Sequence, residues 1–202
     1  MKSRMQKWRI RLSVLAGVVF FAFNSVTASR WERESPLVSA LLFSLGLVLV
    51  GVASLGRLWC SLYIAGYKSS RLVTEGPYSL SRNPLYFFSL LGFIGVGLAS
   101  ETLLMPAILV LAFASYYPAV IRAEEKRLNF LHLESYLEYA RSTPRFFPAV
   151  GKLREPETYV VNPKIFRRHL LDALVFGWCV GILEILEELR HLGWNPQLFT
   201  TY

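Results

Sequence analysis

Four apolar segments, each close to the length needed to cross a bilayer, dominate this chain. They cover residues 11–28, 36–59, 85–100 and 102–121, and a spanning helix needs about 20 predominantly apolar residues. The bilayer core offers no water to backbone groups, so such a segment has to be helical. Hydrophobic residues make up 53% of the chain and charged residues 18%. The sequence therefore predicts an all-α fold, a polytopic membrane bundle of four to five transmembrane helices.

The basic residues predict the orientation of this bundle. Residues 1–11 carry five positive and no negative charges, whereas the connection 29–35 is neutral overall. The loop after the second segment is again basic, and residues 122–170 hold ten basic and six acidic side chains. Because cytoplasmic loops are enriched in Lys and Arg, we expect four spans with both termini and the polar loops in the cytoplasm. In a bacterial host the membrane would be the inner membrane.

Two segments leave alternatives open. The first follows a basic leader like that of a signal peptide, but no clear small-residue cleavage site follows, so we expect a retained helix, with a cleaved leader as the alternative. The last apolar core, residues 173–183, is flanked by Asp172 and Glu184. It is short for a span, so we expect an interfacial or re-entrant helix. A fifth span is the alternative.

Composition also predicts which partners are absent. The net charge of +8 is explained by membrane orientation, since the basic residues lie beside apolar segments, and no nucleic-acid partner is expected. Cys60 and Cys179 lie in or beside apolar segments without metal-ligand or disulfide spacing. We interpret both as packing residues and expect no metal.

A polar stretch, EGPYSLSRNP at residues 75–84, comes directly before the third apolar segment. Its Gly-Pro pair indicates a turn. Asn83 precedes a proline and is biased away from the helical region. Pro84 can open a helix at the first position, where its missing N–H costs nothing. The simplest interpretation is a helix-starting turn in which Arg82 is an ordinary cytoplasmic charge.

A second polar stretch, residues 124–148, follows the fourth apolar segment. Glu124 and Glu125 lie at the membrane edge, where a carboxylate is costly unless paired or hydrated. A short amphipathic helix is expected to follow and to end before Thr143, with apolar positions at Leu128, Leu131, Tyr136 and Tyr139. In a four-span topology both polar stretches emerge on one face. That arrangement brings Arg82 within reach of the two glutamates.

The two stretches resemble a known family. GPYSLSRNPLY resembles the G-x-Y-x-x-x-R-H-P-x-Y motif of integral-membrane methyltransferases related to isoprenylcysteine carboxyl methyltransferase. The downstream stretch is similar to that family's E-E-x-x-L-x-x-x-F-G-x-x-Y-x-x-Y-x-x-x-x-P-R-x-x-P pattern. Here Asn83 replaces the family's His, and His132 and Leu133 replace its Phe-Gly pair. The resemblance covers about residues 36–148.

The resemblance implies an S-adenosylmethionine-dependent methyltransferase with a cytoplasmic cofactor pocket. It divides the chain into an N-terminal helix with a short external loop (1–35), a methyltransferase core (36–150) and a C-terminal amphipathic or re-entrant extension (151–202). Carried over position by position, the cofactor-binding residues are Tyr78, Arg82, Asn83, Pro84, Tyr86, Glu124, Glu125, Tyr136 and Tyr139. The expected catalytic residues are Arg145 and Glu125.

These residue types suit that cofactor. Its carboxylate, ammonium, sulfonium and adenine ring require a guanidinium, a carboxylate and aromatic faces. The candidates are, in that order, Arg82 or Arg145, Glu124 or Glu125, and Tyr136 or Tyr139. The expected acceptor is a lipid-like or prenylated molecule entering from the bilayer, with membrane lipids as further partners. A carboxylate acceptor such as that of an isoprenylcysteine needs no base.

Three other functions stay open. A phospholipid N-methyltransferase would need a base, for which Glu125 or His132 is the nearby candidate. An NADPH-dependent membrane reductase would need basic residues for the 2′-phosphate, and the candidates are Arg141, Lys152 and Arg154. A non-enzymatic membrane scaffold would keep both motifs as helix-starting turns. The changes at Asn83, His132 and Leu133 would then mark lost catalysis.

Overall fold

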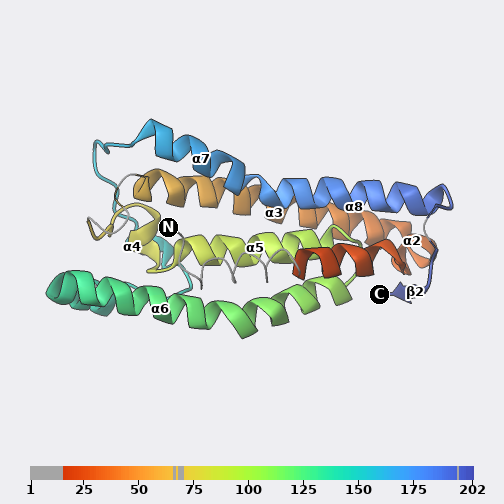
Figure 1. Ribbon diagram of the computed structural model, residues 1–202, viewed down its shortest axis with the longest axis horizontal. Coiled ribbons are helices and arrows are strands. Elements are labelled where there is room, and N and C mark those ends of the chain that lie inside the picture. Colours follow the sequence, from red (N-terminus) through yellow and green to blue (C-terminus); the bar gives the residue numbers. More distant parts are fainter. Residues whose placement is uncertain (1–15, 66, 68–70, 195) are drawn as a thin grey trace.

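The structure is a computed structural model that describes residues 16–65, 67, 71–194 and 196–202. A helix at Ala16–Ser25 is followed by β1 (Thr27–Ser29), α2 (Trp31–Glu34) and α3 (Pro36–Ile64). The chain continues through α4 (Pro77–Leu80), α5 (Pro84–Leu98), α6 (Leu104–Ser142), η1 (Val150–Lys152), α7 (Pro163–Ala173), α8 (Val175–His191) and β2 (Phe199–Thr201). The long helices lie side by side in one bundle (Figure 1). The all-α prediction is confirmed.

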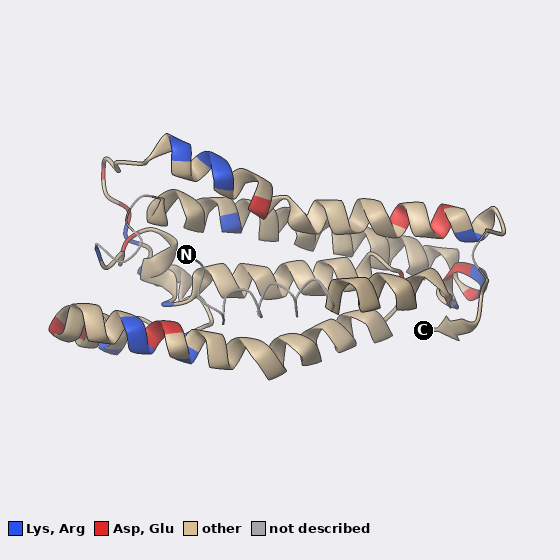
Figure 2. Ribbon diagram, viewed as in Figure 1, with Lys and Arg blue, Asp and Glu red and all other residues tan. Residues whose placement is uncertain are grey.

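The apolar helices make this an integral membrane protein. Among the described residues three helical segments are long and apolar enough to cross a membrane: Pro36–Ile64, Leu104–Ser142 and Pro163–His191. Ala16–Ser25 and Pro84–Leu98 are shorter apolar helices. Charged side chains gather toward the two ends of the bundle and leave its middle uncharged (Figure 2). The first five residues of the predicted span 11–28, and the basic leader before it, lie outside the described residues.

The last apolar segment is longer than predicted. Instead of a short interfacial or re-entrant helix around 173–183, α7 and α8 follow each other through Leu174 and extend along the length of the bundle (Figure 1). Polar residues before the apolar core are also helical, because the Asn162 side chain accepts hydrogen bonds from two backbone N–H groups and caps α7. The alternative of a fifth span is therefore favoured.

The C-terminus lies at the end opposite to α4. β1 and β2 pair in parallel, with Thr27 opposite Phe199, and the Tyr202 hydroxyl donates to Glu34 at 3.1 Å. These contacts hold the last residues beside the connection 29–35 (Figure 1). We expected both termini on the side of the predicted pocket. The structure separates the C-terminus from that pocket because the last helical pair adds one passage through the bundle.

After the fourth span the chain forms a second helical segment, as predicted, although only Leu133 separates it from the span. The helix continues from Leu104 to Ser142 with a kink at Leu133, where φ is 30°. The ψ of Leu133 is −100°, far outside the helical range, so two helical segments meet across this kink. The predicted end before Thr143 is confirmed. The first part of the polar stretch thus extends the fourth span, and the part after Leu133 is a second helical segment.

The core lies where α3, α5 and α8 meet. Val50, Ala53, Val96, Phe176 and Leu183 are among its buried residues, and Cys179 packs against them. Cys60 is buried and both cysteines are free, which confirms their interpretation as packing residues.

The backbones of α3 and α5 touch at two glycines. A Cβ added to Gly46 would lie 2.6 Å from the backbone nitrogen of Ala99 and 2.7 Å from the carbonyl oxygen of Gly95. In a bilayer such close approach supplies the van der Waals contact that holds helices together. The predicted hairpin of the third and fourth spans is also confirmed, and it turns at Glu101, where φ is 60°.

The Gly46 contact predicts a specific loss of stability. Gly46→Leu should destabilise the bundle by about 1–3 kcal/mol, because the new side chain meets backbone that cannot move aside. The matched control is Gly51→Leu on the same helix, where an added Cβ meets nothing within 4 Å. Thermal unfolding in detergent measures both. Equal midpoints for the two variants would contradict this account of the α3–α5 contact.

Candidate functional site

The first polar stretch folds as the predicted helix-starting turn. Gly76 has φ 58°, and a Cβ there would lie 2.3 Å from the Tyr63 ring, so the position requires glycine. The Ser79 hydroxyl donates to the carbonyl oxygen of Gly76 at 2.7 Å and accepts from the backbone N–H of Arg154 at 2.9 Å. α5 then begins at Pro84, as expected. Arg82 and Asn83 lie between α4 and α5.

Backbone hydrogen bonds join this turn to the segment after α6. The Arg82 N–H donates to the carbonyl oxygen of Pro144 at 2.8 Å. Ser81 is fully buried; its hydroxyl donates to the carbonyl oxygen of Phe146 at 2.9 Å and accepts from the N–H of Asn83 at 3.2 Å. The two stretches separated by the α5–α6 hairpin therefore form one unit.

Glu125 is the centre of this unit. One of its carboxylate oxygens lies 2.8 Å from Arg145 Nη2, and the other lies 3.5 Å from Arg82 Nη1 and accepts from Asn83 Nδ2 at 3.0 Å. The Glu125 side chain is only 14% exposed. Arg82 Nη1 also lies 3.4 Å from the Tyr136 hydroxyl. The predicted approach of Arg82 to Glu125 is confirmed, and a largely buried carboxylate is compensated by two guanidinium groups.

Tyrosines complete the site around this centre. The Tyr139 hydroxyl donates to the backbone carbonyl of Tyr78 at 2.7 Å, and the Tyr86 hydroxyl donates to Glu124 Oε2 at 2.6 Å. Burial raises the pKa of the Tyr78 phenol well above its ordinary value. Tyr78 therefore stays neutral at physiological pH.

A cavity of about 200 Å³ opens between α3, α5 and α6. Seven of the ten predicted residues line it: Tyr78, Arg82, Asn83, Pro84, Tyr86, Glu124 and Tyr139. The other three are not among its lining residues: Glu125 and Tyr136 contact Arg82, and Arg145 pairs with Glu125. The structure thus brings all ten together but divides them into lining and supporting residues.

Several lining residues were missed by the sequence analysis. They come from the end of α3, the loop after it, the start of α5 and the polar part of α6: Ile64, Tyr67, Arg71, Leu72, Val73, Leu85, Arg127 and Leu128. Arg71 belongs to the basic loop after the second apolar segment, which the sequence analysis used only for orientation. Its ring contact with Tyr67 and its 3.2 Å ion pair with Glu75 place it at the rim. Nothing in the spacing of these residues marks them as lining a pocket.

A second, more open cavity of about 560 Å³ shares Arg71, Leu72 and Tyr139 with the first. It is lined mainly by polar side chains, including His132 and Arg154. Of the three basic residues weighed for an NADPH phosphate, Arg154 alone is among its lining residues. The Lys152 ammonium instead donates to the carbonyl oxygen of Ser142 at 2.8 Å.

The fold makes the chain an integral membrane protein, and comparison with known families gives its class. The family model for phospholipid methyltransferases matches residues 36–132, and the chain belongs to this family, which includes the isoprenylcysteine carboxyl methyltransferase-like proteins that its motifs resemble.

Two curated relatives align over most of their length. The nickel-cobalt-cadmium resistance protein NccN of Alcaligenes xylosoxydans xylosoxydans is 39% identical over 195 residues, which is 96% of this chain and 88% of the relative. The cobalt-zinc-cadmium resistance protein CzcN of Cupriavidus metallidurans is 43% identical over 180 residues, or 89% of this chain and 82% of the relative. No solved structure matches.

The junction of the two motifs predicts a stability effect at Ser81. Ser81→Ala should cost about 1–3 kcal/mol, because it leaves the part-buried Phe146 carbonyl and the buried Asn83 N–H without this partner. Ser115→Ala on α6 is the control, since that exposed hydroxyl bonds only within its own helix. The comparison uses thermal unfolding in detergent. A Ser81→Ala midpoint equal to that of the control would show that the hydroxyl does not hold the motifs together.

Proposed function

We propose that the protein transfers a methyl group from S-adenosylmethionine to a lipid-like acceptor that arrives from the bilayer. The observation that carries this proposal is the convergence of both family motifs on one cavity, with Glu125 fixing Arg82 at its wall. The basic loops at this end support a cytoplasmic orientation. There the pocket would meet a water-soluble cofactor.

The lining residues fit the cofactor. Arg82 Nε is buried and has no hydrogen-bond partner among the described residues, so it is a donor suited to the cofactor's carboxylate. Glu124 faces the cavity and can accept from the ammonium. Tyr78 and Tyr139 offer apolar ring faces. When bound, S-adenosylmethionine supplies an electrophilic methyl group on its sulfonium.

In this proposal Glu125 supports the site and does not contact the cofactor, whereas its place in the motif indicated a cofactor-binding and catalytic residue. Both of its oxygens are engaged by Arg145, Arg82 and Asn83, and it is not among the residues lining the cavity. It orients the two guanidinium groups. This leaves Glu124 as the carboxylate for the ammonium.

The surroundings of Arg145 favour a carboxylate acceptor with an apolar chain. The Arg145 side chain is 49% exposed and uses one nitrogen on Glu125, so its other donors can hold an acceptor anion. Beside it, Phe87 lies 6.0 Å from Phe146 and 6.4 Å from Phe147, measured between ring centroids. An acceptor such as an isoprenylcysteine carboxylate matches this pairing of charge and aromatic surface.

A carboxylate acceptor also avoids the need for a base. His132 lines the second cavity, beyond Tyr139, and Glu125 has no oxygen turned to the first. Catalysis then comes from alignment of the acceptor anion, which can contribute about 7–11 kcal/mol. An amine acceptor such as a phospholipid headgroup has no comparable proton acceptor in the lining, apart from Glu124.

The decisive experiment is calorimetric binding of S-adenosylhomocysteine to the detergent-purified protein. Arg82→Ala should weaken binding by about tenfold to a hundredfold, because a charge-assisted hydrogen bond is lost. Glu125→Gln should also weaken it, since the Arg82 head group loses its anchor. The controls are Arg122→Ala and Glu134→Gln, two exposed residues of the same helix.

The outcomes separate the candidate functions. Micromolar binding that is reduced only in Arg82→Ala and Glu125→Gln supports the methyltransferase pocket. Uptake of NADPH without S-adenosylhomocysteine would favour the reductase, and the absence of both would favour the scaffold. If the control variants lost as much affinity for S-adenosylhomocysteine, the cofactor would not bind in this cavity.

The printed names of the relatives add a physiological proposal: methylation of a membrane acceptor by this chain contributes to resistance against divalent cobalt, nickel, zinc or cadmium. Alignment over 82–88% of the relatives supports it. In a strain lacking the gene, the wild-type chain should restore growth on cobalt and Arg82→Ala should not. If Arg82→Ala restored growth fully at the same protein level, resistance would not depend on methyl transfer.

A further inference from the structure

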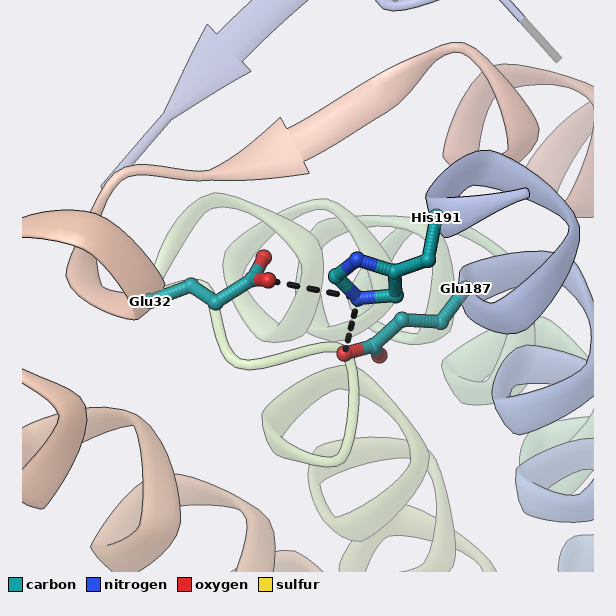
Figure 3. Close-up of side chains that lie close together, drawn as sticks. All are labelled: Glu32, Glu187 and His191. Atoms are coloured by element: carbon teal, nitrogen blue, oxygen red, sulfur yellow. Dashed lines mark ion pairs between the residues drawn. The ribbon is translucent and has the colours of Figure 1, made fainter. Parts of the chain in front are cut away.

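Three metal-ligating side chains meet at the end of the bundle opposite to the methyltransferase pocket. Glu32 comes from α2, and Glu187 and His191 come from the last turns of α8 (Figure 3). His191 Nε2 lies 3.3 Å from Glu32 Oε1 and 3.8 Å from Glu187 Oε1. The three donor atoms all lie within 4.8 Å of one another.

These separations match a coordination polyhedron. Zinc binds imidazole nitrogen and carboxylate oxygen at about 2.0–2.2 Å in tetrahedral geometry, so neighbouring donors stand about 3.4 Å apart. The spacing of Glu187 and His191, four residues apart on one helix, places both on the same face. Glu32 closes the group from a segment far away in the sequence.

The charges around the group also favour a cation. Glu32 and Glu187 are partly buried, with side chains 34% and 24% exposed, and their carboxylates repel each other at this distance. Arg190 Nη2 lies 3.9 Å from the other oxygen of Glu187. Its Nη1 donates to the backbone carbonyl of Asn24 at 2.8 Å, so Arg190 is held on the far side and leaves the oxygen facing His191 available.

We propose that Glu32, Glu187 and His191 form a binding site for one divalent transition-metal ion of the zinc, cobalt or nickel type. Imidazole as a donor favours these ions, whereas magnesium and calcium prefer oxygen ligands alone. Three protein ligands leave at least one coordination position for water or another ligand. The site is independent of the proposed methyl transfer, because it shares no residue with that pocket.

Bound metal would tie α2 to the end of α8. The chain is already joined there by the β1–β2 pairing, by the hydrogen bond from Arg33 to Gln197 and by that from Tyr202 to Glu34. A metal ion adds a strong bridge between the same two segments. The site therefore couples metal binding to the stability of this end of the bundle.

The test is metal titration of the full-length, detergent-purified protein after removal of its affinity tag and treatment with a chelator. Zinc binding is measured by calorimetry and cobalt binding by visible absorption, which reports nitrogen and oxygen coordination. We expect one ion per chain, a higher unfolding temperature with zinc, and no comparable effect of magnesium. His191→Ala and Glu187→Gln should each weaken zinc binding at least about tenfold.

Matched controls lie on α7 and α8. His169→Ala removes a histidine paired with Asp172 on α7, and Glu188→Gln changes the carboxylate next to Glu187; both should bind zinc like the wild type. Glu32→Gln, on the short helix α2, tests the third ligand if a change in α8 prevents folding. Failure of the wild type to bind zinc or cobalt would overturn the proposal and leave a histidine–glutamate ion pair. Wild-type affinity in His191→Ala and Glu32→Gln would overturn it as well.

Discussion

The carboxylate of Glu125, held between two guanidinium groups, is the interaction on which the polar end of the molecule depends. Arg82 precedes α5, Glu125 belongs to α6, and Arg145 follows α6, so one side chain connects three parts of the chain. Breaking a largely buried pair of this kind leaves uncompensated charge, which is far costlier than losing an exposed ion pair. Asn83 supplies the neutral donor that completes the carboxylate's hydrogen bonds.

The bilayer and the pocket place different demands on the same helices. In the apolar part, α3 and α5 approach through Gly46 and Gly95, where the absence of side chains lets backbone contact backbone. Toward the polar end the helices are held by side-chain hydrogen bonds instead. α6 meets both demands because it continues past the apolar segment and carries Glu124 and, beyond the kink at Leu133, Tyr139 to the cavity.

The sequence predicts the helical class, the turn before Pro84 and the grouping of the site residues because these depend on apolar length and on local turn chemistry. It misplaces the C-terminal segment because a cap at Asn162 and packing of Phe176 lengthen a helix beyond its apolar core. It misses Arg71 and Tyr67 at the cavity, since a basic loop residue has the same pattern whether it orients the chain or lines a site. The group around His191 combines residues from α2 and α8, and no local spacing in the sequence predicts that these two segments meet.

The parallel pairing of β1 with β2 joins the first segments of the chain to its last residues. A ribosome releases Phe199–Thr201 only after all the helices that precede them, so β1 has no strand partner among the described residues while the five apolar helices are being inserted. The β1–β2 pairing therefore forms late. It also joins residues far apart in the sequence, so it forms more slowly than contacts between neighbouring helices. A chain without Phe199–Thr201 would keep its helices and its pocket but leave this end open.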